Sequence, residues 1–228
     1  MTFVLIPGAG GQAWYFHRLV PELQARGHDA VAVDLPAEDN SAGLVEYADV
    51  VVDAIDDRTN ITLVAQSLGG FTAPLVCERA HVTLLVMLNA MTPLPGEAPD
   101  TWWEATGHAE ARAEHATREG RDPGFDPMAD FFHDVPQDVI NAAMARGEPD
   151  QSMTPMRNPW PLDHWPEVPT RFLQGRDDRF FPLEFQRRVV KERLALDVDE
   201  MPGGHLVALS RPAELAARLV AYRIAVAR

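Results

Sequence analysis

Cysteine, lysine and long apolar runs are scarce in this chain of 228 residues. Cys77 is the only cysteine, so no intrachain disulfide can form and an oxidising compartment is not implied. No apolar run approaches the roughly 20 residues of a transmembrane helix. The first ten residues also lack the basic start of a secretory signal. We therefore expect a cytoplasmic protein that does not bind membranes.

Positive charge is scarce as well. Lysine and arginine together number 20 against 34 aspartates and glutamates, which gives a formal net charge of −14. Affinity for nucleic acid comes largely from basic side chains that neutralise phosphates, and anionic membrane surfaces attract basic segments. We expect neither kind of partner. Lys191 is the only lysine, a fact that bears on one possible mechanism below.

Short apolar runs alternate along the chain with longer amphipathic stretches. Most of the short runs are apolar at consecutive positions, as expected where helices cover both faces of a parallel sheet. The pattern predicts strands over residues 3–6, 30–33, 61–66, 83–89 and 170–174, with a weaker edge strand over 196–201. It predicts helices over residues 13–26, 42–57, 68–80, 183–194 and 212–226. Within the first of these, Pro21 must lie at a kink or near a fresh helix start.

This alternation predicts an α/β fold with a mostly parallel central sheet flanked by helices. Residues 91–168 interrupt it, because they are rich in proline, glycine, charge and aromatic side chains. A structureless loop of that length is unusual, so we expect a small helical insertion there. The predicted organisation is a core domain of residues 1–90 and 169–228 with a cap, or lid, formed by residues 91–168.

Ser67 lies where the strand predicted over 61–66 meets the helix predicted over 68–80. Small residues stand two positions away on each side, at Ala65 and Gly69. A nucleophile elbow needs this pattern, because its turn is so sharp that larger side chains would collide with the neighbouring strand and helix. The alternative is a serine that only caps the helix.

A nucleophilic serine needs a base that is oriented by an acid, and in this architecture both should follow it in the order acid, then base. Asp177 and Asp178 both lie in the turn after the strand predicted over 170–174. One of them could instead serve the turn itself. His205 lies on a glycine-led loop before the last helix and is the only histidine after the two aspartates. A surface histidine without a role is the alternative.

The reaction also needs N–H donors for a developing oxyanion. Leu68, the residue after the serine, can supply one, and Ala9 in the glycine-rich loop over residues 7–11 is best placed to supply the other. A nucleotide-binding loop is the competing interpretation, but the lysine and hydroxyl of a P-loop are missing, as is a third spaced glycine, because residue 13 is alanine. We expect no cofactor and no metal site.

Four segments carry a resemblance to the α/β-hydrolase family: "LIPGAGGQAWYF", "LVAQSLGG", "GRDDRFFP" and "GGHLVALSRPAEL". The chain looks most like small esterases related to plant methylesterases and hydroxynitrile lyases. The resemblance implies Ser67 as nucleophile and His205 as base. It implies Asp178 as acid, because the family aspartate usually lies four residues before the proline at Pro182, and it leaves Asp177 to the turn.

The chain departs from that family at two places. Ala65 replaces the usual first glycine of the elbow, and alanine is small enough to fit. Pro7 and Gly8 stand where His-Gly often precedes the oxyanion loop. The loop therefore lacks a side chain that often organises it.

The resemblance implies a serine hydrolase that cleaves a carboxylic ester of a small, largely apolar molecule through an acyl-enzyme. A perhydrolase, an acyltransferase and a receptor that keeps the triad are alternatives. A haloalkane dehalogenase would need an aspartate nucleophile, and a hydroxynitrile lyase would need a lysine in the cap, whereas Lys191 follows the acid loop. The sequence makes no prediction about oligomeric state.

Aromatic side chains of the predicted cap, and two residues after the oxyanion loop, are candidates to line a substrate pocket. The alternative for each is a place in the core of the cap or at its contact with the sheet. The candidates are Trp14, His17, Trp102, Trp103, Phe131, Phe132, Trp160 and Trp165.

Overall fold

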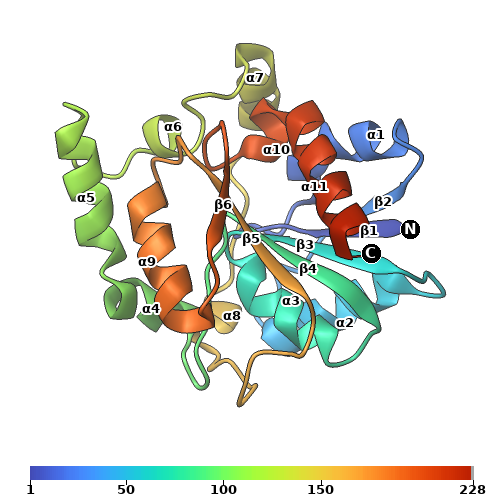
Figure 1. Cartoon of the computed structure of the whole chain (residues 1–228). Coiled ribbons are helices and arrows are strands. Elements are labelled where there is room, and N and C mark those ends of the chain that lie inside the picture. The colour runs from blue at the N-terminus through green and yellow to red at the C-terminus, as the bar shows by residue number, and fades with distance from the viewer. Residues whose placement is uncertain (227–228) are drawn as a thin grey trace.

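A parallel sheet of six strands forms the centre of the computed structural model, which describes residues 1–226 (Figure 1). Neighbouring strands pair in parallel in the order β2-β1-β3-β4-β5-β6. The strands are β1 (Thr2–Ile6), β2 (Asp29–Ala32), β3 (Ile61–Gln66), β4 (Val82–Leu88), β5 (Thr170–Gly175) and β6 (Val198–Met201). The predicted α/β fold is confirmed, and β6 lies at the edge as expected.

Helices cover both faces of this sheet, which explains the consecutive apolar positions in its strands. Along β1, Val4 and Ile6 pack in one core cluster, whereas Phe3 and Leu5 pack in another on the opposite face. The first cluster includes side chains of α2 (Leu44–Ile55), α3 (Gly69–Cys77) and α9 (Leu183–Leu194). The second includes side chains of η1 (Ala13–Phe16), α1 (Leu19–Gln24), α10 (Val207–Ser210) and α11 (Pro212–Val226).

The helix predicted over residues 13–26 is divided, and Pro21 lies near a fresh helix start, one of the two outcomes that its ring predicts. The structure has the short 3₁₀ helix η1 followed by α1, with a break between them. Pro21 is the physical reason, because its ring has no N–H and is tolerated only in the first turn of a helix. It is the third residue of α1.

Residues 91–168 contain five helices, as expected for a helical insertion. They are α4 (Pro99–Thr106), α5 (His108–Arg118), α6 (Pro127–Asp130), α7 (Gln137–Arg146) and α8 (Met153–Arg157). Figure 1 shows α4 and α5 beside α9, and α7 near α10. Trp102 and Trp160 join the main core cluster, so part of the insertion packs into the core itself. The division into core and cap domains stays a prediction.

The strand order brings three loops together at one edge of the sheet. Ser67 follows β3, Asp178 follows β5 and His205 follows β6, and the carboxyl ends of parallel strands share an edge. Between residues 1 and 226, no helix has both the length and the apolar character needed to cross a bilayer.

Candidate active site

Ser67 occupies a strained turn between β3 and α3. Its φ of 53° lies in the left-handed region, which residues other than glycine seldom adopt. Three backbone hydrogen bonds hold it there: its N–H donates to Leu88 O at 3.3 Å, and its carbonyl accepts from Gly70 at 3.1 Å and Met91 at 3.0 Å. A Cβ added to Gly69 would lie 2.7 Å from Pro7 O, so this glycine is sterically required.

Asp178 and His205 form a buried pair. The Nδ1 atom of His205 lies 2.9 Å from Oδ2 of Asp178, and the two side chains are 3% and 0% exposed. A carboxylate only accepts hydrogen bonds, so the imidazole proton sits on Nδ1 and the Nε2 atom is left as an acceptor. This is the tautomer that a general base requires.

Every remaining acceptor position of the Asp178 carboxylate is also used. Its Oδ1 accepts from the N–H groups of Phe180 and Phe181, each at 2.9 Å. Its Oδ2 accepts from Gln174 Nε2 at 3.1 Å, in addition to His205. These bonds fix the orientation of the buried carboxylate.

Asp177 lies next to this pair in the sequence but serves the turn. Its carboxylate pairs with Arg176 at 3.1 Å and accepts from Gly203 N at 3.0 Å, while its own N–H donates to Gly203 O at 3.0 Å. Partial burial opposes ionisation, yet the bonds from Arg176 and Gly203 prevail and lower the pKa of Asp177. Asp177 therefore ties the acid loop to the histidine loop.

Ser67 and His205 line the same cavity, which has a volume of about 500 Å³. Among the described residues, Ser67 Oγ makes no hydrogen bond to the imidazole. Such bonds are often long before substrate binds and shorten in the reacting complex. The structure thus brings the three predicted residues to one site, with the acid–base contact formed.

Two residues that the sequence reasoning missed hold the backbone of the histidine loop. Asn89 is fully buried, and its Nδ2 donates to Gly204 O at 3.1 Å and His205 O at 2.9 Å, while its Oδ1 accepts from Gly175 N at 2.7 Å. Asp134 accepts from Gly204 N at 2.8 Å. Asn89 could have been found, because it is a polar residue at the carboxyl end of an apolar strand.

Aromatic rings enclose the imidazole of His205. The centroids of Phe131, Phe180 and Phe181 lie 5.2, 5.2 and 5.1 Å from its own. Behind them, His108 of α5 has its Nε2 atom 2.8 Å from Phe180 O and so donates to that carbonyl. Burial lowers the pKa of His108 to about 4, so its ring is neutral at pH 7.

The glycine-rich loop after β1 packs directly on the serine. A Cβ on Gly8 would lie 2.8 Å from Ser67 Cβ. Gly8 N donates to Gln66 Oε1 at 3.2 Å, Gly10 N to Gln151 Oε1 at 2.9 Å and Gly11 N to Gly8 O at 3.1 Å.

In the described part of the chain, the backbone N–H groups of Ala9 and Leu68 donate no hydrogen bond of this kind. Within residues 1–226, neither Ala9 N nor Leu68 N donates a hydrogen bond to the protein. Ala9 also lines the cavity. Both predicted oxyanion donors therefore have their N–H groups available.

The walls of the cavity are mostly apolar. Phe131 and Phe132 lie among them, and Glu148 is the only carboxylate. Tyr15 and Leu206 also line it and went unnoticed in the sequence, although each follows a recognised motif closely. The remaining apolar side chains in the lining are Ala9, Phe125, Pro127, Met128, Ala143, Met144 and Pro149.

Six of the eight residues predicted to line the substrate pocket lie elsewhere, which corrects that expectation. Trp102 is completely buried against Phe181 and Phe185, and its Nε1 donates to Thr92 O at 3.1 Å. Trp103 packs against His108. Trp102 fills the core beside α9, where a large ring gains most from full burial, and the partly buried Trp103 packs against that core.

Trp14 and His17 lie on the outside of η1. Their rings stack with centroids 4.6 Å apart, and the guanidinium of Arg146 lies 5.5 Å from the Trp14 ring. Trp160 and Trp165 are also used structurally, donating to Phe71 O and to Thr170 Oγ1, each at 3.1 Å. None of the four lines the cavity.

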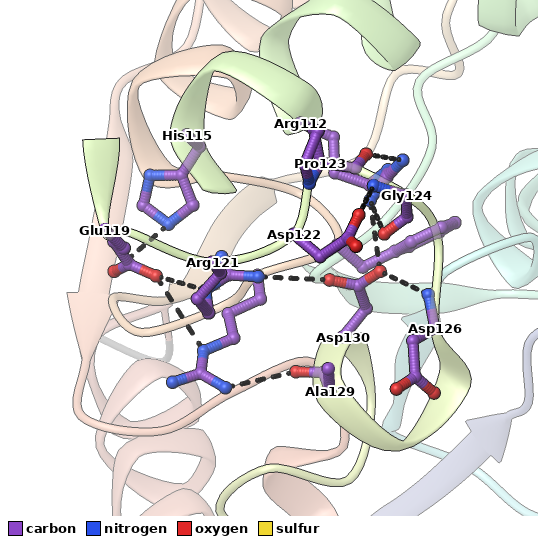
Figure 2. A network of polar contacts seen from close by, with 12 residues as sticks. Arg112, His115, Glu119, Arg121, Asp122, Pro123, Gly124, Asp126, Ala129 and Asp130 are labelled. Carbon is purple, nitrogen blue, oxygen red and sulfur yellow. Dashed lines mark hydrogen bonds and ion pairs between the residues drawn. The ribbon is translucent and has the colours of Figure 1, made fainter. Parts of the chain in front are cut away.

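Figure 2 shows an ionic network around Asp130, which lies in the sequence between the lining residues Met128 and Phe131. Asp130 is 1% exposed and accepts from Arg112 Nη1 at 3.2 Å, Asp126 N at 3.2 Å and Arg121 Nη1 at 3.5 Å. Arg112 also donates to Gly124 O at 3.2 Å and to Pro123 O at 2.9 Å. The network fixes the segment that carries the lining residues 125–132.

The described part of the chain holds no group of three or more histidine, cysteine or acidic side chains placed to bind a metal ion.

Known proteins are similar to this chain over most of its length. A rice protein (Oryza sativa subsp. indica) named "Probable esterase PIR7A" is 27% identical over 93% of this chain and 93% of its own length. The alpha-hydroxynitrile lyase of Arabidopsis thaliana is 24% identical over 93% of each chain. The solved structure of a pyrethroid hydrolase from Sphingobium faniae matches 99% of this chain and 98% of its own, with a TM-score of 0.75 and 23% identity.

The family itself follows from a match that covers nearly the whole chain. The model described as the alpha/beta hydrolase family matches residues 3–218, which include the serine, aspartate and histidine loops. The relatives also confirm the resemblance to plant esterases and hydroxynitrile lyases that the motifs indicated. The chain belongs to the alpha/beta hydrolase family.

Proposed function

We propose that this protein is a carboxylic ester hydrolase that uses Ser67 as nucleophile, His205 as general base and Asp178 as the acid that orients His205. The observation that carries the proposal is the buried contact between Asp178 and His205, with Ser67 on a strained turn lining the same cavity. The esterases among the relatives support ester hydrolysis.

The reaction proceeds through an acyl-enzyme. His205 Nε2 takes the proton from Ser67 Oγ as that oxygen attacks the carbonyl carbon of the ester. The tetrahedral intermediate collapses, and the imidazolium gives its proton to the departing alcohol. A water molecule, deprotonated by His205, then attacks the acyl-enzyme and releases the carboxylic acid and free Ser67.

The oxyanion of each tetrahedral intermediate is stabilised by the N–H groups of Ala9 and Leu68. Both groups lack a protein acceptor among the described residues. Leu68 follows Ser67 directly, and Ala9 follows Gly8, which packs on Ser67. Donors that are fixed before reaction lower the barrier without the cost of reorganising solvent. Leu68 also stands at the N-terminus of α3, where the helix dipole favours negative charge.

The substrate is a small, largely apolar, uncharged ester. The cavity of about 500 Å³ matches a small molecule, and its walls are built mainly from phenylalanine, methionine, proline and alanine. Glu148 in the lining, together with the absence of any arginine or lysine there, disfavours a substrate that bears a carboxylate.

A hydroxynitrile lyase is disfavoured even though one of the relatives carries that name. Lys191, the only lysine, lies on α9, where its side chain is 62% exposed and pairs with Asp197 at 3.1 Å. It does not line the cavity. The lysine that the resemblance associates with cyanohydrin cleavage is therefore missing from the site.

A panel of chromogenic esters with acyl chains of increasing length tests the proposal, on wild type and Ser67→Ala. We expect wild type to hydrolyse short apolar esters over many turnovers and the variant to lose at least about 10³-fold in rate. Equal hydrolysis by both proteins contradicts the assignment of Ser67. Release of only about one alcohol per chain by wild type indicates a receptor instead of an enzyme.

A further inference from the structure

The oxyanion loop lacks the histidine that often organises it in this family, so other groups must hold it. Two glutamine side chains do so. Gln66, which precedes the nucleophile, accepts from Gly8 N, and Gln151 accepts from Gly10 N. Gly11 N closes the turn onto Gly8 O. Among the successive N–H groups of residues 8–11, only that of Ala9 is left without an acceptor within the described chain.

Gln151 belongs to the segment that returns from α7 to α8, far from the loop in sequence. Its Nε2 atom donates to Tyr47 Oη at 3.2 Å and to Ser152 O at 2.9 Å. These acceptors fix the amide so that Oε1 faces the N–H group of Gly10, a group that can only donate. Tyr47 is 1% exposed and lies on α2, so the amide is held against a rigid part of the core.

The same segment also packs tightly on the loop. A Cβ added to Gly10 would lie 2.6 Å from Pro149 Cβ, so the Pro149 ring packs directly against the backbone of Gly10. Ser152 N donates to Ala37 O at 2.7 Å, and Ser152 Oγ donates to Asn40 Oδ1 at 3.0 Å. Contacts of Pro149 and of Ser152 therefore hold the segment in place on both sides of Gln151.

We propose that Gln151 is a positioning residue of the oxyanion hole. By taking the N–H of Gly10, it fixes the orientation of the loop so that the Ala9 N–H faces the cavity. Gln66 does the same for Gly8 from the other side. The inference rests on the proposed function, because it assigns to Ala9 the role of oxyanion donor. It makes the segment over residues 147–152 part of the catalytic apparatus.

The central variant is Gln151→Met, which keeps the length of the side chain but has no strong acceptor for Gly10 N. We expect kcat to fall about tenfold or more with little change in KM, since the affected interaction forms only in the transition state. Gln151→Glu keeps an acceptor and should recover most of the loss. Gln137→Met removes an exposed amide on α7 that bonds only Asn141, and should change nothing.

Two inhibitors separate this role from a merely structural one. An alkyl boronic acid forms a tetrahedral adduct with the serine and places an oxygen in the oxyanion hole. The carboxamide analogue of the best ester binds without forming such an adduct. In Gln151→Met, the Ki of the boronic acid should rise by the same factor as kcat falls, while the Ki of the carboxamide stays unchanged.

Two results overturn the inference. In one, Gln151→Met keeps wild-type kcat and boronic acid affinity. In the other, it weakens the carboxamide as much as the boronic acid, which indicates general damage to the cavity. If Gln151→Met does not fold, Tyr47→Phe removes one acceptor that orients the amide, and it should weaken the boronic acid selectively by a few-fold.

Failure of this inference is distinguishable from failure of the proposed function. If Ser67→Ala hydrolyses esters like wild type, the proposed function is wrong, and so is the role of Gln151 that rests on it. If Ser67→Ala is inactive while Gln151→Met matches wild type with both inhibitors, only the role of Gln151 is wrong.

Discussion

Asp177 and Asp178 are adjacent in the sequence, yet their carboxylates face different partners. Asp178 contacts the imidazole of His205 in a buried place, whereas Asp177 pairs with Arg176 near the surface. The residues alone left both possible, and only the resemblance favoured Asp178. The geometry supports that choice, because Asp178 is buried and contacts His205, whereas Asp177 is partly exposed and contacts Arg176.

Substitution of each aspartate by asparagine tests this separation. In Asp178→Asn, an amide N–H facing Nδ1 favours the wrong histidine tautomer, so we expect kcat to fall about 10³- to 10⁴-fold. In Asp177→Asn, an acceptor for Gly203 N remains, and kcat should stay within about tenfold of wild type. Steady-state kinetics with one ester gives both values, and unfolding curves control for stability. A larger loss in Asp177→Asn contradicts the assignment.

At the scale of single residues, the order of the motifs along the chain made the candidate catalytic residues predictable. The residues that line the cavity were not predictable, because they depend on long-range packing. Ser67 and His205 lie in local motifs whose place after a strand can be recognised. Trp102 and Phe131 are both aromatic residues of the insertion, yet one fills the core and the other lines the cavity. Nothing local in the sequence distinguishes them, because the difference depends on which element packs against each ring.

Elements were predictable where a strand is buried on both faces or a helix has one apolar stripe. The strand over residues 61–66 and the helices over 183–194 and 212–226 have the predicted bounds, whereas other elements differ by a few residues at their ends, where capping and fraying decide the bounds. Pro21 divides the helix predicted over residues 13–26, as its ring led us to expect. The connections of the insertion were not predictable, because its short helices are held by contacts such as that between His108 and Phe180.

His108 should make the packing of α5 against the acid loop sensitive to acid. Burial lowers its pKa to about 4 from an ordinary value of 6.5, although the bond to Phe180 O opposes this. The folded state therefore binds a proton less readily than the unfolded state. The contribution of neutral His108 to the free energy of unfolding is fully present above about pH 6.5. It is lost as the pH falls towards 4, which lowers the free energy of unfolding by about 3 kcal/mol.

Urea unfolding of wild type and His108→Gln at pH 7 and pH 4 measures this effect. Glutamine can still donate to Phe180 O but does not titrate in this range. The free energy of unfolding should fall between the two pH values by about 3 kcal/mol more in wild type than in the variant. The same pH dependence in both proteins contradicts the role assigned to His108.

The network around Asp130 should be essential to the segment over residues 119–132 (Figure 2). Arg112→Met removes the main partner of a buried carboxylate, so we expect a loss of about 3–5 kcal/mol in the free energy of unfolding. Arg112→Met combined with Asp130→Asn should lose less than the sum of the single changes. Denaturant unfolding measures all three variants.

Arg58→Met is the matched control for that prediction. Arg58 pairs with Asp29 at 3.1 Å, with side chains that are 34% and 50% exposed. Such an exposed pair is worth at most about 1 kcal/mol. If Arg112→Met is no more costly than Arg58→Met, the network does not hold the wall of the cavity.

At the scale of the whole molecule, one sheet edge gathers the loops after β1, β3, β5 and β6. The alternation of strands and helices predicted this edge, and the motifs predicted which residues stand on it. The insertion supplies Phe131 and Phe132 to the cavity and Gln151 to the oxyanion loop. Its contribution depends on the packed structure, since Gln151 lies 141 positions from Gly10.

The central claim is that Ser67 is the nucleophile, and a dialkyl 4-nitrophenyl phosphate tests it most directly. The reagent phosphorylates an activated serine and releases 4-nitrophenolate once. We expect one nitrophenolate per chain, an adduct that peptide mass spectrometry locates on Ser67, and loss of esterase activity in proportion to labelling. A fully labelled protein that stays active, or an adduct located on another residue, contradicts the claim.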